Sequence, residues 1–432
     1  MQHTLSPRTR RQFLSGGLKA AAVVAIVPRH ALGGPGRKAP SDVITRGTVG
    51  TGGMGMGHVH TNAEGQPPVT LAVCDVDKKR LENAIKKAGS GCTAYSDFRA
   101  LLDRKDIDTV EIATPPHWHA LVSIHAAQAG KDVLCEKPMT RFIAEGQAVI
   151  DAIERYGRVY QIGTYGRFGG GAKTLRKLVA SGLLGTPITV RVTNRTGYNW
   201  KVRGWSGQPR LVPQPVPPEL DYNLWLGPSP YKPYHPHRVH GSFRCYWDYD
   251  GGGLADMGQH YLDPITYWLN KDDTDPVEIE AYAERPQHDD AVRLWGRVTM
   301  KYEDGTTLIL ESGEWGEPEP GEHPFIEGPK GKVIGGSEGV RLDQTDPPGL
   351  FEAAASMPDP PRMIGFHEGV RSRKQPGGSA LSSHRACCLM HLANIAIRTG
   401  RRLRYDPVAQ HFIGDEQANR LVNVPMRAPW HL

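Results

Sequence analysis

The sequence predicts an α/β protein in which an N-terminal Rossmann dinucleotide-binding domain precedes an α+β domain with an open-faced, mostly antiparallel sheet. Three observations support this prediction. Short apolar strand patterns alternate with helix patterns up to residue 163, a G-x-G-x-x-G motif follows the first strand, and later strands alternate polar and apolar residues. At 432 residues, with 39% hydrophobic and 23% charged residues, the chain has room for two or three soluble domains.

The N-terminal segment has a pattern typical of export. An arginine pair, Arg10-Arg11, precedes Phe-Leu and the uncharged run 20–27. That run is shorter than the roughly 20 residues that span a bilayer, but it has the size of the apolar part of a secretory signal. We therefore expect residues 1–33 to be a Tat signal segment that sends the folded protein to the periplasm, with no membrane span in the mature protein. A basic disordered tail and an uncleaved anchor are the alternatives.

The net charge of +6 does not indicate a nucleic-acid-binding protein. Residues 1–40 hold seven basic residues and no acidic one, so subtracting these seven from +6 leaves −1 for the rest. No basic stripe for phosphate backbones remains. The six cysteines form no C-x-x-C motif; their even number permits disulfides, but Cys74 and Cys135 end apolar strands and favour buried free thiols.

Strand and helix patterns alternate in residues 41–163, which we take as the Rossmann NAD(P)-binding domain. The first strand fits least well, because it contains Arg46 and Thr48 where a central parallel strand is normally apolar, and we expect a distorted first unit. The expected strands are 44–49, 69–74, 109–113, 132–135 and 159–162, and the expected helices are 77–87, 117–129 and 143–156.

Residues 164–432 have a different pattern, which we take as an α+β substrate and oligomerisation domain. Residues 208–236 carry nine prolines and predict a long irregular loop, which is usually functional. Turn residues such as Glu303-Asp304-Gly305 join strand patterns of alternating polarity, as in an antiparallel sheet. The expected strands are 188–194, 277–283, 292–302 and 306–311, and the expected helices are 258–269 and 380–398.

The glycine motif predicts a dinucleotide site. Gly50 permits a tight turn, Gly52 lets the backbone approach a pyrophosphate, and Gly55 allows close packing of helix on strand. Asp75 follows 20 residues after Gly55 at the end of the next strand, where an acid can bind a ribose 2′-hydroxyl. A carboxylate repels a 2′-phosphate, so the sequence favours NAD over NADP, although the neighbouring basic residues 78–80 weaken that preference.

A second motif, Glu136-Lys137-Pro138, lies at the carboxyl end of an expected strand, where open α/β sheets bind ligands. A lysine there can donate to a substrate hydroxyl and stabilise alkoxide character. The alternative is a surface Lys-Pro turn.

A third motif contains Asp256 and His260, which lie at i and i+4 on one face if the segment is helical. A nearby carboxylate fixes the tautomer of an imidazole and raises its basicity, so His260 could act as a general base. The alternative is a helix-capping Asp and a structural His.

In order and spacing, these motifs together with Thr114-Pro115 resemble the Gfo/Idh/MocA family of glucose-fructose oxidoreductases and inositol dehydrogenases, from about residue 41 to 432. Residues 221–228 and 427–430 resemble its exported, Tat-signalled branch. The resemblance implies an active site between the two domains and homo-oligomers formed through the sheet face. It implies Lys137, Asp256 and His260 as the catalytic residues. The expected cofactor-binding residues are Gly50, Gly52, Gly53, Met54, Gly55, Asp75, Thr114, Pro115, His119, Glu136 and Lys137.

We expect an NAD(P)-dependent oxidoreductase that acts on a secondary hydroxyl or carbonyl of a small-molecule carbohydrate and retains its cofactor through export. One alternative is an NAD-dependent glycosidase, which oxidises C3 of the sugar, eliminates the glycosidic group, adds water and reduces C3 again. The other is a non-catalytic sugar-binding protein. No metal site is expected, because the three H-x-H pairs lack further ligands at clear spacing. Four tryptophans could stack on sugar rings or belong to the core: Trp200, Trp205, Trp225 and Trp247.

Overall fold

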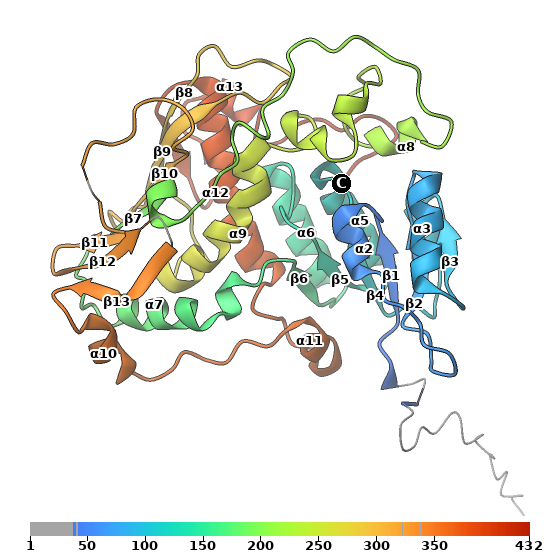
Figure 1. Ribbon diagram of the computed structural model, residues 1–432, viewed down its shortest axis with the longest axis horizontal. Coiled ribbons are helices and arrows are strands. Elements are labelled where there is room, and N and C mark those ends of the chain that lie inside the picture. The colour runs from blue at the N-terminus through green and yellow to red at the C-terminus, as the bar shows by residue number, and fades with distance from the viewer. Residues whose placement is uncertain (1–37, 40–41, 322, 337–338) are drawn as a thin grey trace, which may run out of the picture. The chain divides into compact units, whose positions relative to one another are not determined.

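A computed structural model (Figure 1) describes residues 38–39, 42–321, 323–336 and 339–432 of the chain. The expected signal segment, 1–33, lies outside the described residues. One compact unit contains residues 44–62 and 68–432. Residues 63–67 belong to a separate small unit, in which the Gln66 amide donates to the Ala63 carbonyl. None of the helices in the described part of the chain is both long and apolar enough to cross a membrane.

The first sheet is parallel throughout, as the alternation of strands and helices predicted, and its order is β3-β2-β1-β4-β5-β6. β3 was not expected, because it has only three residues and lies at the exposed edge. The strands are β1 (Arg46–Val49), β2 (Thr70–Cys74), β3 (Thr93–Tyr95), β4 (Thr109–Ile112), β5 (Asp132–Cys135) and β6 (Tyr160–Ile162). The helices are α2 (Gly53–His58), α3 (Lys78–Ala88), α4 (Phe98–Leu102), α5 (His119–Gln128) and α6 (Ile143–Arg155).

The first unit is distorted, as expected. All four residues of β1 are buried, its register with β2 shifts between Arg46 and Gly47, and α2 has only six residues. The buried charge of Arg46 is compensated by Glu111 on the neighbouring β4, with Nη1 and Oε1 2.7 Å apart. A charged residue is therefore tolerated in a central strand because the next strand supplies its counter-ion.

The second sheet has nine strands in the order β13-β12-β11-β7-β10-β9-β8-β14-β15. Each pairing is antiparallel except that of β7 with β10, so the sheet is mostly antiparallel, as predicted. The strands are β7 (Thr189–Thr193), β8 (Glu278–Ala283), β9 (Trp295–Lys301), β10 (Thr307–Glu311), β11 (Ile326–Gly328), β12 (Gly331–Gly336), β13 (Gly339–Asp346), β14 (Leu403–Asp406) and β15 (His411–Phe412).

The two faces of this sheet differ in polarity. On one face Ile279, Met300 and Leu308 are neighbours across β8, β9 and β10, and all three are buried. On the other face Glu280 and Arg297 are partly or fully exposed. The buried face packs on α12 (Ala380–Thr399), which also packs on α9 (Gly252–Leu269). One face therefore builds the core, and the open face is largely charged.

Helix α9 begins at Gly252, six residues before the expected start at 258. Three consecutive glycines, 251–253, oppose helix formation, so the sequence did not predict the first turns of this helix. A Cβ atom on Gly253 would lie 1.9 Å from the Trp200 carbonyl oxygen, so close packing requires the glycine. The longer helix includes Asp256 and gives it the i, i+4 relation to His260 that the motif predicted.

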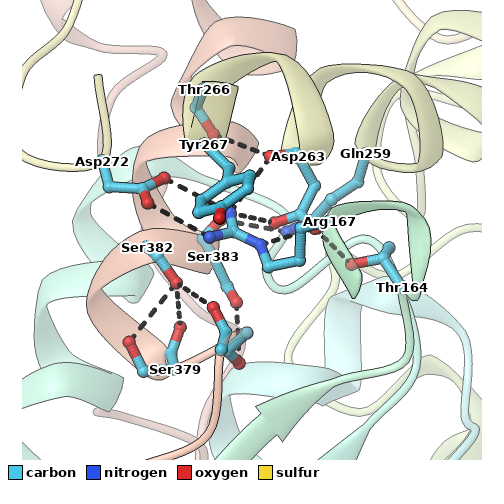
Figure 2. Close-up of polar contacts among 12 residues, drawn as sticks. Thr164, Arg167, Gln259, Asp263, Thr266, Tyr267, Asp272, Ser379, Ser382 and Ser383 are labelled. Atoms are coloured by element: carbon cyan, nitrogen blue, oxygen red, sulfur yellow. Dashed lines mark hydrogen bonds and ion pairs between the residues drawn. The ribbon is translucent and has the colours of Figure 1, made fainter. Parts of the chain in front are cut away.

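A buried ion pair joins the end of the first sheet to α9 (Figure 2). Arg167, in the turn η4 (Gly166–Phe168), donates to both carboxylate oxygens of Asp263 at 2.6 and 3.0 Å. Arg167 also contacts Asp272 at 3.1 Å, and the Thr164 hydroxyl donates to Asp263 at 2.9 Å. Arg167 and Asp263 are essentially inaccessible to solvent. The contacts fix the helix that carries Asp256 against the parallel sheet.

The remaining elements are short apart from α7. The proline-rich stretch 208–236 is irregular, as expected, except for α8. These elements are η3 (Pro116–Trp118), α7 (Gly170–Ala180), η5 (Asn194–Thr196), α8 (Tyr222–Leu226), η6 (Pro236–Arg238), η7 (Ser242–Cys245), α10 (Leu350–Ala355), α11 (Phe366–Ser372) and α13 (Glu416–Asn419).

Candidate active site

A cavity of about 370 Å³ opens at the carboxyl ends of β1, β2, β4 and β5. Open parallel sheets bind ligands at this edge. The opposite wall comes from residues 219–244, which we call the covering segment, and from the start of α9. The cavity thus combines the glycine motif with residues that lie far away in the sequence.

The glycine loop forms a backbone cradle that side chains would fill. Gly50 has φ +86°, and a Cβ atom there would lie 2.7 Å from the backbone of Ala113. A Cβ atom on Gly55 would lie 1.8 Å from the Gly50 carbonyl oxygen, so the helix start packs directly on the turn. Gly50, Gly52, Gly53 and Met54 line the cavity, whereas Gly55 lies behind it.

Asp75 lies at the end of β2 and lines the same cavity. One carboxylate oxygen accepts hydrogen bonds from the Thr51 amide at 2.7 Å and the Thr51 hydroxyl at 3.0 Å, and the other accepts from the Asp77 amide at 2.9 Å. Of the three basic residues that follow, only Arg80 lines the cavity, while Lys78 and Lys79 are exposed. A Cβ atom on Gly52 would lie 2.8 Å from Arg80 Nη1, so this guanidinium lies beside the glycine loop.

Lys137 and Asp256 meet in the cavity. Lys137 Nζ donates to the Asp256 carboxylate at 2.9 Å and to its backbone carbonyl at 2.8 Å, and both side chains are at most 9% exposed. Arg244 Nε donates to the same carboxylate oxygen at 2.6 Å. Burial alone would raise the pKa of Asp256, but the charges of Lys137 and Arg244 lower it below its ordinary value. Asp256 is therefore a carboxylate at neutral pH that holds the lysine in place.

Glu136 is held by a buried charge network. His58 Nε2 lies 2.9 Å from Glu136, and His58 Nδ1 lies 3.7 Å from Glu111, which in turn pairs with Arg46. Burial tends to lower the pKa of His58, but the hydrogen bond to Glu136 and the charge of Glu111 raise it overall. The same hydrogen bond lowers the pKa of Glu136, although burial opposes this.

The residues of this cavity fit a dinucleotide. Besides the backbone cradle and Asp75, the cavity is lined by Thr114, Pro115 and Glu136. The Thr114 hydroxyl is buried and has no hydrogen-bond partner within the described part of the chain, which suits a ligand that would supply one.

Sequence models of one oxidoreductase family match nearly all of this unit. Residues 44–164 match its NAD-binding Rossmann fold and residues 168–432 match its C-terminal alpha/beta domain. The chain belongs to the Gfo/Idh/MocA oxidoreductase family.

Curated relatives of this family match over part of their length. Inositol 2-dehydrogenase of Salmonella typhimurium is 32% identical over 191 residues, which cover 44% of this chain and 56% of that protein. D-apiose dehydrogenase of Paraburkholderia graminis is 30% identical over 38% of this chain and 42% of that protein. The chain thus spans about half the length of these relatives.

A solved structure of similar fold is the WlbA dehydrogenase of Bordetella pertussis, determined in complex with NADH and UDP-GlcNAcA. It is 20% identical, covers 84% of this chain and 99% of its own, and has a TM-score of 0.57. At this identity the likeness shows the shared Gfo/Idh/MocA fold.

Two other expected site residues lie apart from the cavity lining. His119 is buried behind it, with Nδ1 2.6 Å from the Pro138 carbonyl and Nε2 2.8 Å from the Thr114 carbonyl. His260 is exposed, and no hydrogen bond joins it to Asp256 among the described residues. We expected Asp256 to raise the basicity of His260. Although part of the side chain is exposed, the surrounding protein desolvates the ring, and this desolvation together with the charge of Lys137 lowers the pKa of His260 instead.

Sequence reasoning missed Arg244 and Asp250, which both line the cavity. Asp250 is 1% exposed, and burial together with the charge of Asp256 raises its pKa to about 7. Its position directly before the glycine triplet was a usable signal, whereas the contact of Arg244 with Asp256 depends on the tertiary fold.

The covering segment is tied to the loop after β2. The Lys78 amide donates to the Glu219 carbonyl and the Asp221 amide donates to the Val76 carbonyl, both at 3.0 Å. At the other end of α8, Arg427 donates to Asn223 and to the Gly227 carbonyl at 2.8 to 3.0 Å. Near the C-terminus, Trp430 packs edge-on against Trp118 at 4.8 Å, and Trp118 lines the cavity.

The other candidate features differ in their surroundings. In the described residues, no group of three or more His, Cys, Asp or Glu side chains is placed to hold a metal ion. Trp200 and Trp247 are core residues, and Trp225 lines the cavity. All six cysteines are free, and Cys74 and Cys135 are buried thiols, as predicted.

Proposed function

We propose that this protein is an NAD(P)-dependent oxidoreductase acting on a secondary hydroxyl or carbonyl of a sugar or glycoside. The observation that carries the proposal is the contact of Lys137 with Asp256 in a cavity that also contains the glycine cradle and Asp75. A fixed ammonium group at the carboxyl end of a parallel strand can stabilise negative charge on a reacting oxygen.

Each catalytic residue has a separate role. Lys137 donates a hydrogen bond to the substrate oxygen, and Asp256 orients the lysine. His260 accepts the hydroxyl proton; its lowered pKa leaves it neutral at pH 7, as a base must be. The nicotinamide cofactor, when bound, accepts hydride from the carbinol carbon or returns it.

The cofactor is NAD in this proposal, and NADP is the second choice. Asp75 supports NAD because its carboxylate would repel a 2′-phosphate. Arg80 is the cavity-lining residue that opposes this preference. The glycine loop, Thr114, Pro115, Glu136 and Lys137 line the cavity and would hold the cofactor. His119 would act behind them by fixing the carbonyls of Thr114 and Pro138.

The cofactor is retained, and the protein is exported through the Tat route with residues 1–33 as its signal. The covering segment supports retention, because it forms the wall of the cavity opposite the glycine loop. In the periplasm a retained cofactor needs regeneration in place, which favours a redox-neutral cycle. Residues 41–163 act as the cofactor domain, and residues 164–432 bind substrate and form homo-oligomers through the open, charged sheet face.

One observation supports the glycosidase alternative. Elimination of a glycosidic group needs a proton donor, and Asp250, with a pKa near 7, is a buried carboxyl group in the same cavity. Net hydrolysis of a glycoside would distinguish this activity from oxidation.

The test is a cofactor assay on protein purified without added dinucleotide. The protein is denatured and the supernatant is assayed for NAD(H) and NADP(H), followed by a screen of glycosides for keto or cleaved products. We expect near-stoichiometric NAD(H). No release, together with no binding of added NAD or NADP, would overturn the oxidoreductase and leave a sugar-binding protein.

A further inference from the structure

A second hollow of about 690 Å³ lies next to the active-site cavity, and no role described so far explains it. Its lining combines aromatic rings with amide and charged groups, the combination that recognises sugar rings and their hydroxyls. The residues that matter here are Asn194, Tyr198, Asn199, Lys201, Trp205 and Glu314.

One pair of side chains connects the linings of the two cavities. Arg244 lines the first cavity and binds Asp256, and its guanidinium lies 5.1 Å from the ring centroid of Trp205, which lines the second. The Tyr261 hydroxyl, next to His260 in the sequence, donates to the Asn199 carbonyl at 2.8 Å. The second hollow is therefore fixed to the same residues that hold the catalytic groups.

The loop that forms the hollow contains a strained residue and is held by hydrogen bonds. Lys201 has φ +52°, a conformation that non-glycine residues adopt at a cost and that is concentrated at functional sites. Both carboxylate oxygens of Glu314 hold the loop by accepting from the amides of Val202 and Arg203 at 2.9 and 2.8 Å. The Asn199 side chain accepts from the Lys201 amide at 3.0 Å.

The polar ends of Asn194 and Lys201 remain available to a ligand. Both residues are exposed, and neither side chain makes a hydrogen bond or ion pair within the part of the chain that the structure describes. An amide offers a donor and an acceptor and an ammonium offers three donors, which suits adjacent hydroxyl groups.

We propose that this hollow is a subsite for a second sugar ring, so that the substrate is a glycoside of at least two rings. The reacting ring lies at Lys137 and Asp256, and the neighbouring ring lies beyond the Arg244–Trp205 pair. The inference rests on the proposed function and specifies its substrate class.

The test compares disaccharides with methyl glycosides that share the reacting ring. The pairs are cellobiose with methyl β-D-glucopyranoside, maltose with methyl α-D-glucopyranoside, and lactose with methyl β-D-galactopyranoside. The measured quantity is kcat/KM for reduction of the dinucleotide in the holoenzyme, with tryptophan fluorescence titration of the same sugars as a binding readout. We expect at least one disaccharide to be preferred by about tenfold or more.

The variant Asn194→Ala/Lys201→Ala removes both free polar groups and keeps the Cβ atoms. It should reduce this preference by about tenfold while leaving the methyl glycoside values and the cofactor content unchanged. Lys330→Ala, at an exposed lysine outside both cavities, is the matched control. Equal values within every pair, or a preference that the double variant keeps, would overturn the second subsite and leave the oxidation intact. If none of the sugars reduces the dinucleotide, the result counts against the proposed function. The fluorescence titration then tests the subsite separately, by whether disaccharides bind more tightly than methyl glycosides.

Discussion

Lys137 shows how one side chain in this protein depends on its partners. Its ammonium group makes two hydrogen bonds, both to Asp256, and is almost fully shielded from water. A lysine stem is flexible, so these contacts supply the orientation that the side chain lacks on its own. Because Arg244 shares the same carboxylate oxygen, the local charge remains positive at the point where an oxyanion would form.

Replacing Lys137 with Met should lower kcat by about 10²–10³-fold, since one donor to the developing oxyanion is lost. Bound dinucleotide should remain, because the glycine cradle is untouched. Steady-state kinetics and cofactor content check this prediction. Lys105→Met, at an exposed lysine, is the control; equal losses in both variants would remove Lys137 from the catalytic residues.

His260 should set the acid limb of the pH profile. Burial and the charge of Lys137 lower its pKa below the ordinary 6.5, so the neutral, base-competent form is present above that lowered value and is lost as pH falls through it. The value of kcat/KM for oxidation should therefore hold down to at least pH 6.5 and decrease below it. His260→Gln should lose activity, and its remaining kcat/KM should no longer decrease at acid pH. If the variant keeps the acid limb, another group is responsible for it.

At the level of elements, α2 is joined to the end of β5 by His58 and Glu136. The pKa of His58 is raised above 6.5, so its stabilising effect is complete below 6.5 and is lost as pH rises through the higher folded value. The pKa of Glu136 is lowered from 4.5, so its effect is complete above 4.5 and is lost as pH falls through the lower folded value. The pair should stabilise the protein most between pH 4.5 and 6.5.

The measurement is the difference in unfolding free energy between the wild type and His58→Gln across pH. It should reach about 1.5 kcal/mol inside that window and decline on both sides. His411→Gln changes a histidine at an exposed position and is the control. A difference that rises with alkaline pH would contradict the expected sign.

The link between η4 and α9 depends on Arg167 and Asp263. Arg167→Leu leaves a buried carboxylate unpaired and should lower the unfolding free energy by about 3–5 kcal/mol. Arg167→Leu/Asp263→Leu should recover much of this loss, because both buried charges are then removed. Chemical denaturation measures both effects, with Arg371→Leu as an exposed control. If the double variant is less stable than Arg167→Leu, the cost of the single substitution does not come from the unpaired carboxylate.

The sequence predicted the elements that have strong local patterns and missed those determined by packing. The parallel strands ending at Cys74, Ile112 and Cys135 are short apolar runs, so their positions were clear. β11 to β13 are rich in glycine, and β15 has two residues, so neither shows alternation. The site followed the same rule. Motif residues were found, whereas Arg244 meets Asp256 only after the chain folds. The Asp256 carboxylate pairs with Lys137 and Arg244 and not with the neighbouring His260.

At the scale of the whole molecule, the covering segment forms one wall of the cavity opposite the parallel sheet. Arg427 holds α8 through three hydrogen bonds of its guanidinium to Asn223 and Gly227. Arg427→Ala should release this segment and speed the loss of bound dinucleotide by about tenfold. A chase of the holoenzyme with excess labelled NAD gives the rate. Arg420→Ala is an exposed control, and equal rates in both variants would show that α8 does not retain the cofactor.

The two backbone hydrogen bonds between the covering segment and the loop after β2 have a further consequence. The amide protons of Lys78 and Asp221 can exchange with solvent only when those bonds open. Their deuterium uptake therefore measures how often the two sides of the cavity separate. If the cavity must open to exchange its contents, dinucleotide turnover cannot be faster than the opening that these two amides record.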